Sequence, residues 1–132
     1  MIHKSLSIIA LICLFSGTPV SANIIPEEII LAIQTGNSKE LANYFNDNIE
    51  LVILDEEDVY SRHQAEQIMK NYFTRNVPQS FTILHEGGKD GSHYAIGNLV
   101  TNQGEYRIYF LTKQKGDRLL IHQLRIEEKD DN

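Results

Sequence analysis

The sequence predicts an α+β fold, with N-terminal helices and one long helix packed against an antiparallel sheet. Two observations lead to this prediction. Residues 61–75 repeat apolar side chains at helical spacing, and residues 80–127 form β-rich runs separated by short turns that contain glycine. Residues 23–132 are enough for one domain with a single core.

The first 22 residues have the three parts of a secretory signal peptide. His3 and Lys4 give a positive start, residues 6–15 are almost entirely apolar, and residues 20–22 (Val-Ser-Ala) supply the small side chains that signal peptidase needs. The apolar run is about half of the roughly 20 residues that a membrane-spanning helix requires. We therefore expect cleavage after Ala22, no transmembrane anchor afterwards, and an exported protein that is periplasmic or secreted.

Composition limits the classes of partner and cofactor. The chain has 12 Lys and Arg against 18 Asp and Glu, which gives a formal net charge of −6 at pH 7. An acidic protein repels a phosphate backbone, so we expect no nucleic-acid partner. The single cysteine, Cys13, lies in the signal peptide, so the mature domain has no disulfide. The sequence has no metal-ligand spacing and no phosphate-binding loop, and we expect neither a metal nor a cofactor.

Two short helices are predicted at the start of the domain. Pro26 suits the first turn of a helix, where its missing N–H would have no partner in any case, and residues 35–37 (Thr-Gly-Asn) end this helix. Ser38 is the expected N-cap of the second helix. Residues 46–48 (Asn-Asp-Asn) are expected to form a turn before the first strand.

A β-branched run and a long amphipathic helix come next. Residues 49–54 predict a strand, residues 55–58 a turn, and residues 59–60 a short returning strand. Ser61 is expected to cap a helix that extends to Arg75. The apolar face of this helix is formed by Ala65, Ile68, Met69, Tyr72 and Phe73.

Four strands in a meander complete the predicted domain. They cover residues 80–86, 94–101, 106–113 and 118–127. The turns between them lie at residues 87–91, 102–104 and 115–117. The polar tail at residues 128–132 is expected to fray.

Four segments carry a resemblance to known proteins. They are IPEEI at 25–29, LANYFN at 41–46, YAIGNL at 94–99 and LIHQLRI at 120–126. The chain resembles the nuclear transport factor 2-like (cystatin-like) superfamily and, more closely, a small family of exported bacterial domains of unknown function, over nearly all of residues 25–128. The resemblance implies a strongly bent, cone-shaped sheet around the long helix, with a pocket at its open end. Because that superfamily includes both enzymes and binding or dimerisation modules, the resemblance leaves the function open.

Strand alternation divides the predicted sheet into two faces once the turns are assigned. We pair Thr101 with Glu105 and Gln114 with Arg118, which makes the inner face mostly apolar. The side chains expected to line the pocket are Tyr72 from the long helix and Tyr94, Asn98, Tyr106, Phe110 and His122 from the inner face. The outer face then has an apolar patch, the expected homodimer interface, which consists of Tyr109, Leu111, Leu119 and Ile121.

His122 is the one candidate for a catalytic residue. A histidine titrates near neutrality and could act as a general base, or it could be a hydrogen-bonded core residue. The predicted inner strands supply no Asp or Glu beside it, whereas enzymes of the resembled superfamily typically have an Asp or a His/Asp pair in the pocket. We therefore interpret the protein as a non-enzymatic exported module that binds a small apolar ligand or dimerises. The alternatives are a small lyase, isomerase or hydrolase with His122 as base, and an accessory subunit without a ligand.

Overall fold

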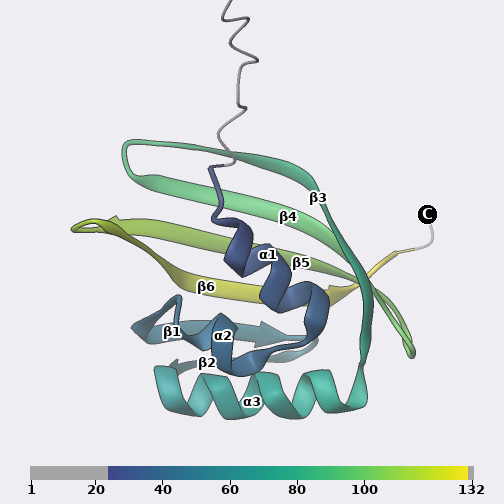
Figure 1. The fold of residues 1–132 in the computed structure, drawn as a ribbon. Coiled ribbons are helices and arrows are strands. Elements are labelled where there is room, and N and C mark those ends of the chain that lie inside the picture. Colours follow the sequence, from purple (N-terminus) through teal and green to yellow (C-terminus); the bar gives the residue numbers. More distant parts are fainter. Residues whose placement is uncertain (1–23, 131–132) are drawn as a thin grey trace, which may run out of the picture.

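The computed structural model describes residues 24–130, so the predicted signal peptide at residues 1–22 lies outside the described residues. Three helices are present in this part of the chain: α1 (Glu27–Thr35), α2 (Ser38–Ala42) and α3 (Arg62–Arg75). The strands are β1 (Phe45–Ile53), β2 (Glu56–Ser61), β3 (Pro78–Lys89), β4 (Ser92–Thr101), β5 (Gly104–Lys115) and β6 (Arg118–Glu128). The predicted order of helices and strands is thus confirmed (Figure 1). No helix within residues 24–130 is long and apolar enough to cross a membrane.

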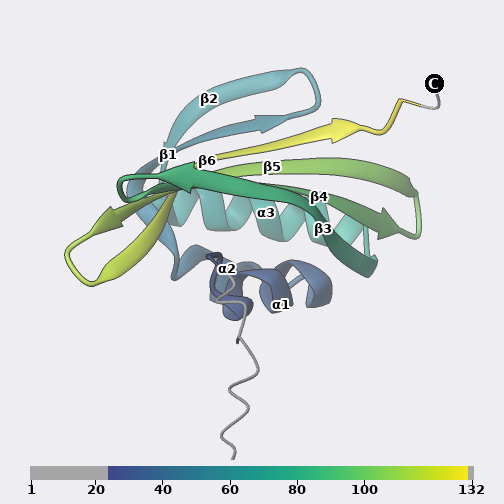
Figure 2. The ribbon, with the colours of Figure 1, turned by 90° about the horizontal axis from the view of Figure 1, so that it is seen from above.

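One six-stranded sheet, in the order β2-β1-β6-β5-β4-β3, forms the second layer of the fold. All three helices lie on one side of it, and the other side carries no helix (Figure 2). Neighbouring strands are antiparallel except β1 and β6, which are parallel. The prediction of a wholly antiparallel sheet is therefore wrong at this pair. After β2 the chain passes through α3 and the antiparallel strands β3, β4 and β5. The last strand, β6, then lies next to β1 and runs in the same direction.

Local capping signals explain the helix boundaries. Gly36 ends α1 with φ 65°, a left-handed conformation that glycine adopts without strain. Asn37, rather than the predicted Ser38, is the N-cap of α2, because its side chain accepts a 3.1 Å hydrogen bond from the backbone N–H of Glu40. Ser61 caps α3 as predicted, in a reciprocal arrangement with Gln64.

The core fills the space between the helices and the inner face of the sheet. Met69 on α3, Phe45 on β1 and Phe110 on β5 are completely buried. A buried side chain of this size contributes roughly 1.5–3 kcal/mol relative to an exposed one. On α3 the predicted apolar face points inward: Ala65, Met69, Tyr72 and Phe73 are buried, and Ile68 is half-buried.

Three predicted turns are largely strand in the structure. Residues 46–48 belong to β1, which begins at the buried Phe45. The predicted turn at 55–58 shortens to residues 54–55, and β3 continues through 87–89. At Gly88 a Cβ atom would lie only 2.1 Å from the carbonyl oxygen of Ser92, so the absence of a side chain lets the two strands stay paired.

The β4–β5 hairpin differs from the prediction by one residue. Thr101 pairs with Gly104 across a two-residue loop, not with Glu105. Because successive side chains in a strand alternate, this shift exchanges the two faces of β4. Ala95 and Leu99 therefore point into the core, while Asn98 lies on the outer face opposite Arg107.

The β5–β6 hairpin combines a shorter loop with a bulge. Lys115 pairs with Arg118, and between the pairs Leu111–Gln123 and Thr112–Ile121 the extra residue His122 has no partner in the ladder. The bulge leaves Leu124 and Ile126 on the inner face, and it also turns Ile121 into the core. His122 is left half-exposed.

Candidate functional site

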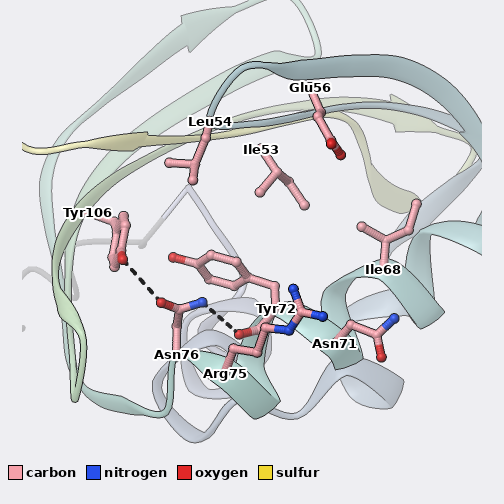
Figure 3. A pocket seen from close by; sticks show the side chains of 9 residues that line it. All are labelled: Ile53, Leu54, Glu56, Ile68, Asn71, Tyr72, Arg75, Asn76 and Tyr106. Carbon is pink, nitrogen blue, oxygen red and sulfur yellow. Dashed lines mark hydrogen bonds between the residues drawn. The ribbon is translucent and has the colours of Figure 1, made fainter.

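A cavity of about 370 Å³ opens between α3, the β1–β2 turn and β5. Figure 3 shows side chains from both layers converging on it. Its lining consists of Ile53, Leu54, Glu56, Ile68, Asn71, Tyr72, Arg75, Asn76 and Tyr106. A volume of this size falls in the range of small-molecule sites.

Two tyrosines from different layers meet in the cavity. The rings of Tyr72 on α3 and Tyr106 on β5 lie edge to face, with their centroids 5.9 Å apart. The Tyr106 hydroxyl donates a 3.1 Å hydrogen bond to Oδ1 of Asn76, and Nδ2 of Asn76 donates a 3.0 Å hydrogen bond to the carbonyl oxygen of Tyr72. These contacts, drawn in Figure 3, fix the C-terminal end of α3 against the sheet.

The Tyr72 hydroxyl is the unsatisfied polar group of this site. It is inaccessible to solvent and has no hydrogen-bond partner within residues 24–130. Burial, and to a smaller extent Tyr106, raise the pKa of Tyr72, so its hydroxyl keeps its proton at neutral pH. A buried hydroxyl without a partner costs about 1–3 kcal/mol. In Figure 3 the hydroxyl points toward the space between Tyr106 and Leu54.

The walls and the rim of the cavity differ in chemistry. Ile53, Leu54 and Ile68 give apolar walls, and the exposed Glu56 and Arg75 place opposite charges at its edge. Glu56 and Arg75 form no ion pair with each other. The cavity therefore offers apolar contact, one buried hydroxyl and a rim that bears both signs of charge.

Of the residues predicted to line a pocket, the structure brings two together. Tyr72 and Tyr106 line the cavity, whereas Phe110 is completely buried in the core. Tyr94 and Asn98 lie on the opposite face of the sheet because of the shift in the β4–β5 hairpin.

His122 does not line the cavity either. The bulge removes it from the inner face, and the pKa of its imidazole is lowered by burial and by the positive charges of Lys113 and Lys115. No group of three or more His, Cys, Asp or Glu side chains within the described part of the chain could hold a metal ion.

The predicted interface patch is divided by the same bulge. Tyr109 and Leu111 lie half-buried on the outer face. Ile121, by contrast, is completely buried in the core. Leu119 pairs with Gln114, which lies two positions after the inward-facing Thr112 on β5. Leu119 therefore belongs to the inner face as well. The four residues therefore do not form one surface.

The cavity residues at the C-terminal end of α3 are absent from the predicted pocket. Asn71, Arg75 and Asn76 extend the helical spacing of Ile68 and Tyr72, so that periodicity could have placed them at one end of the helix. Glu56 has no such signal, because the sequence predicts a turn at residues 55–58, whereas β2 begins at Glu56 in the structure.

Comparison with known proteins identifies the family. A family model for a domain of unknown function, DUF4783, matches residues 26–127. The chain belongs to the DUF4783 family. Solved DUF4783 structures are similar to it throughout: the protein from Bacteroides ovatus is 33% identical, with a TM-score of 0.78 over 81% of this chain and 97% of its own. The protein from Bacteroides fragilis is also 33% identical, with a TM-score of 0.76 over 80% of this chain and 99% of its own.

More distant neighbours define the fold class of this DUF4783 domain. A cystatin-like domain of unknown function from Nostoc punctiforme is 8% identical, with a TM-score of 0.62 over 79% of this chain and 72% of its own. An NTF2-type protein with a long sheet is 19% identical, with a TM-score of 0.61 over 76% of this chain and 94% of its own. The resemblance to nuclear transport factor 2-like and cystatin-like proteins is thus confirmed. Among curated proteins, none matches the chain.

Proposed function

We propose that this DUF4783 domain binds a small molecule in the cavity between α3 and the sheet, and that it does so as an exported protein. The ligand has a mostly apolar body and one polar group that hydrogen-bonds with Tyr72. The observation that carries the proposal is the buried Tyr72 hydroxyl, which has no partner within residues 24–130 although it borders a cavity. A ligand that satisfied this hydroxyl would recover the free energy lost by burying it.

Access to the hydroxyl requires one local movement. Leu54 lies at the turn between β1 and β2, has φ 55° and is 43% exposed. Its side chain can therefore swing outward without disturbing the core, and the ligand takes its place beside Tyr72. The apolar Ile53 and Ile68 then cover the body of the ligand.

A binding role is better supported than catalysis by His122. The imidazole lies outside the cavity, and no other histidine lines it. The charged side chains that do line it, Glu56 and Arg75, are exposed at the rim.

The test uses 4-pentylphenol as a probe, because it has an apolar chain and a single hydroxyl. We expect saturable NMR chemical-shift changes centred on Tyr72 and Tyr106. In Tyr72→Phe the affinity for the probe should be about tenfold weaker, a loss of about 1.4 kcal/mol of binding free energy. Ile68→Trp should fill the cavity and abolish binding, whereas Thr74→Trp, at an exposed position of the same helix, is the matched control. Shifts that bypass both tyrosines, or equal affinity in Ile68→Trp, would contradict the proposal.

A further inference from the structure

A second hollow adjoins the cavity at the turn between β1 and β2. It measures about 330 Å³, and its lining consists of Leu54, Asp55, Glu127 and Glu128. We call it the acidic hollow, because every lining residue except Leu54 carries a carboxylate. Leu54 also lines the cavity beside Tyr72, so the two spaces meet at this one side chain.

Backbone pairing brings the acidic hollow next to the cavity. The N–H of Leu54 donates a 2.9 Å hydrogen bond to the carbonyl oxygen of Ile126, which holds the β1–β2 turn against the end of β6. Glu128, two residues further along, pairs with Tyr106 of β5, which lines the cavity. Because directly paired residues project to the same face of a sheet, Glu128 lies on the cavity side.

The carboxylates around this opening outnumber the positive charges. Those without an ion pair within residues 24–130 are Asp55, Glu56 and Glu128. Lys129 does not neutralise them, because its Nζ contacts Oε2 of Glu105 at 2.8 Å. Among the residues that line the cavity and the acidic hollow, Arg75 is the only cation. The opening therefore favours a positively charged group.

The buried hydroxyl of Tyr72 points toward the same opening. Tyr72 is only 7% exposed, and its hydroxyl has no hydrogen-bond partner in the described part of the chain. Figure 3 shows this hydroxyl directed at the space between Tyr106 and Leu54. A molecule that hydrogen-bonds with Tyr72 and extends past Leu54 therefore ends among the carboxylates of the acidic hollow.

We propose that the cavity and the acidic hollow form one site for an amphipathic organic cation, in which an apolar body joins a polar group to a protonated amine. The inference rests on the proposed binding role of the cavity and adds the charge of the ligand. With Leu54 turned outward, the polar group reaches Tyr72, the apolar body fills the cavity, and the ammonium lies between Asp55 and Glu128. An ammonium has three N–H donors, and its hydrogen bonds to carboxylates are strengthened by charge.

An anionic ligand fits this site less well. It would have Arg75 as its one cationic partner and would meet the carboxylates of the acidic hollow, as well as the net charge of −6 of the whole chain. A metal ion needs several ligands at once, and within residues 24–130 no group of three or more His, Cys, Asp or Glu side chains could hold one. An ammonium needs only one or two carboxylates.

The first experiment compares three probes that share a phenol and a linear chain. They are 4-pentylphenol, 4-(5-aminopentyl)phenol and 6-(4-hydroxyphenyl)hexanoate, whose chains end in a neutral, a positive and a negative group. At low salt we expect the amine to bind about five- to tenfold more tightly than 4-pentylphenol, and the carboxylate to bind more weakly than either. The preference for the amine should shrink at about 0.5 M salt, which screens exposed charges. An amine that binds no more tightly than 4-pentylphenol overturns the proposal.

The second experiment removes two carboxylates of the acidic hollow. In Asp55→Asn combined with Glu128→Gln, the ratio of the affinities for the amine and for 4-pentylphenol should fall to about one. Asp117→Asn is the matched control, because Asp117 is exposed in the turn before β6, at the other end of that strand from Glu128. This control should keep the preference for the amine. A preference that survives the double substitution overturns the proposal.

The two proposals fail in different ways. If 4-pentylphenol shifts the signals of Tyr72 and Tyr106 but the amine has no advantage, only the inference about charge is overturned. If none of the three probes binds, the proposed binding role of the cavity is overturned as well.

Discussion

The hydroxyl of Tyr106 on β5 donates a hydrogen bond of 3.1 Å to the side-chain oxygen of Asn76, the residue that ends α3. This contact joins the sheet to the long helix at the edge of the cavity. In Tyr106→Phe the acceptor on Asn76 loses its donor, so we expect the free energy of unfolding to fall by about 1 kcal/mol. Chemical denaturation measures the change, and an unchanged midpoint would mean that the contact contributes nothing.

The same substitution at Tyr72 should have the opposite consequence. Its hydroxyl is buried and has no partner within residues 24–130, so Tyr72→Phe removes an unsatisfied group. We expect the stability of the ligand-free protein to stay the same or to rise by about 1 kcal/mol, while ligand binding weakens. Denaturation of the two Tyr→Phe variants side by side is the matched comparison. A clear loss of stability in Tyr72→Phe would show that the hydroxyl has a structural role.

Gly97 is required by its neighbour Phe81. A Cβ atom at Gly97 would lie 2.3 Å from a ring carbon of Phe81, which is buried in the core. We expect Gly97→Ala to lower the free energy of unfolding by about 1–3 kcal/mol, the usual cost of overpacking. In the double variant with Phe81→Leu the smaller side chain makes room, so the two losses should be less than additive. Full additivity would contradict a direct clash.

The bulge at His122 should appear in the pH dependence of stability. The pKa of His122 is lowered, first by burial and then by Lys113 and Lys115, so the folded protein binds its proton less readily than the unfolded chain. Unfolding is then coupled to the uptake of a proton by His122. The free energy of unfolding therefore falls as the pH drops below about 6.5, and this fall ends once the pH lies below the pKa of His122 in the folded protein.

His122→Asn should therefore lose less stability on acidification than the unmodified protein. Denaturation between about pH 7.5 and about pH 5 covers the range in which an ordinary histidine titrates. His63→Asn on α3, where the side chain is 82% exposed, is the matched control for removing an imidazole. If the stability of His122→Asn depends on pH in the same way as that of the unmodified protein, the pKa of His122 is not lowered in the folded protein.

The helices could be predicted from the sequence because their signals are local. Ser61 with Gln64, and Gly36 at the end of α1, act within one turn of the residues that they cap. The apolar spacing on α3 likewise placed Tyr72 on the inner side of the helix. The parallel pairing of β1 with β6 has no such local signal, since more than sixty residues separate the two strands.

The faces of the sheet could be predicted only in part. The inward direction of Ile108 and Leu124 is set by the alternation within their own strands. For β4 the outcome depended on whether the loop before Gly104 has two or three residues, and for His122 it depended on a bulge. A shift of one residue in either place exchanges core and surface. The predicted pocket therefore kept Tyr72 and Tyr106 and lost Tyr94, Asn98 and His122.

The most direct test of the binding role is an experimental structure of the protein purified from its native host. We expect non-protein density in the cavity, with a polar atom within about 2.7–3.2 Å of the Tyr72 hydroxyl and the side chain of Leu54 turned outward. A cavity that holds only water, with Leu54 closed over Tyr72 and no ligand recovered from the same preparation, would contradict it.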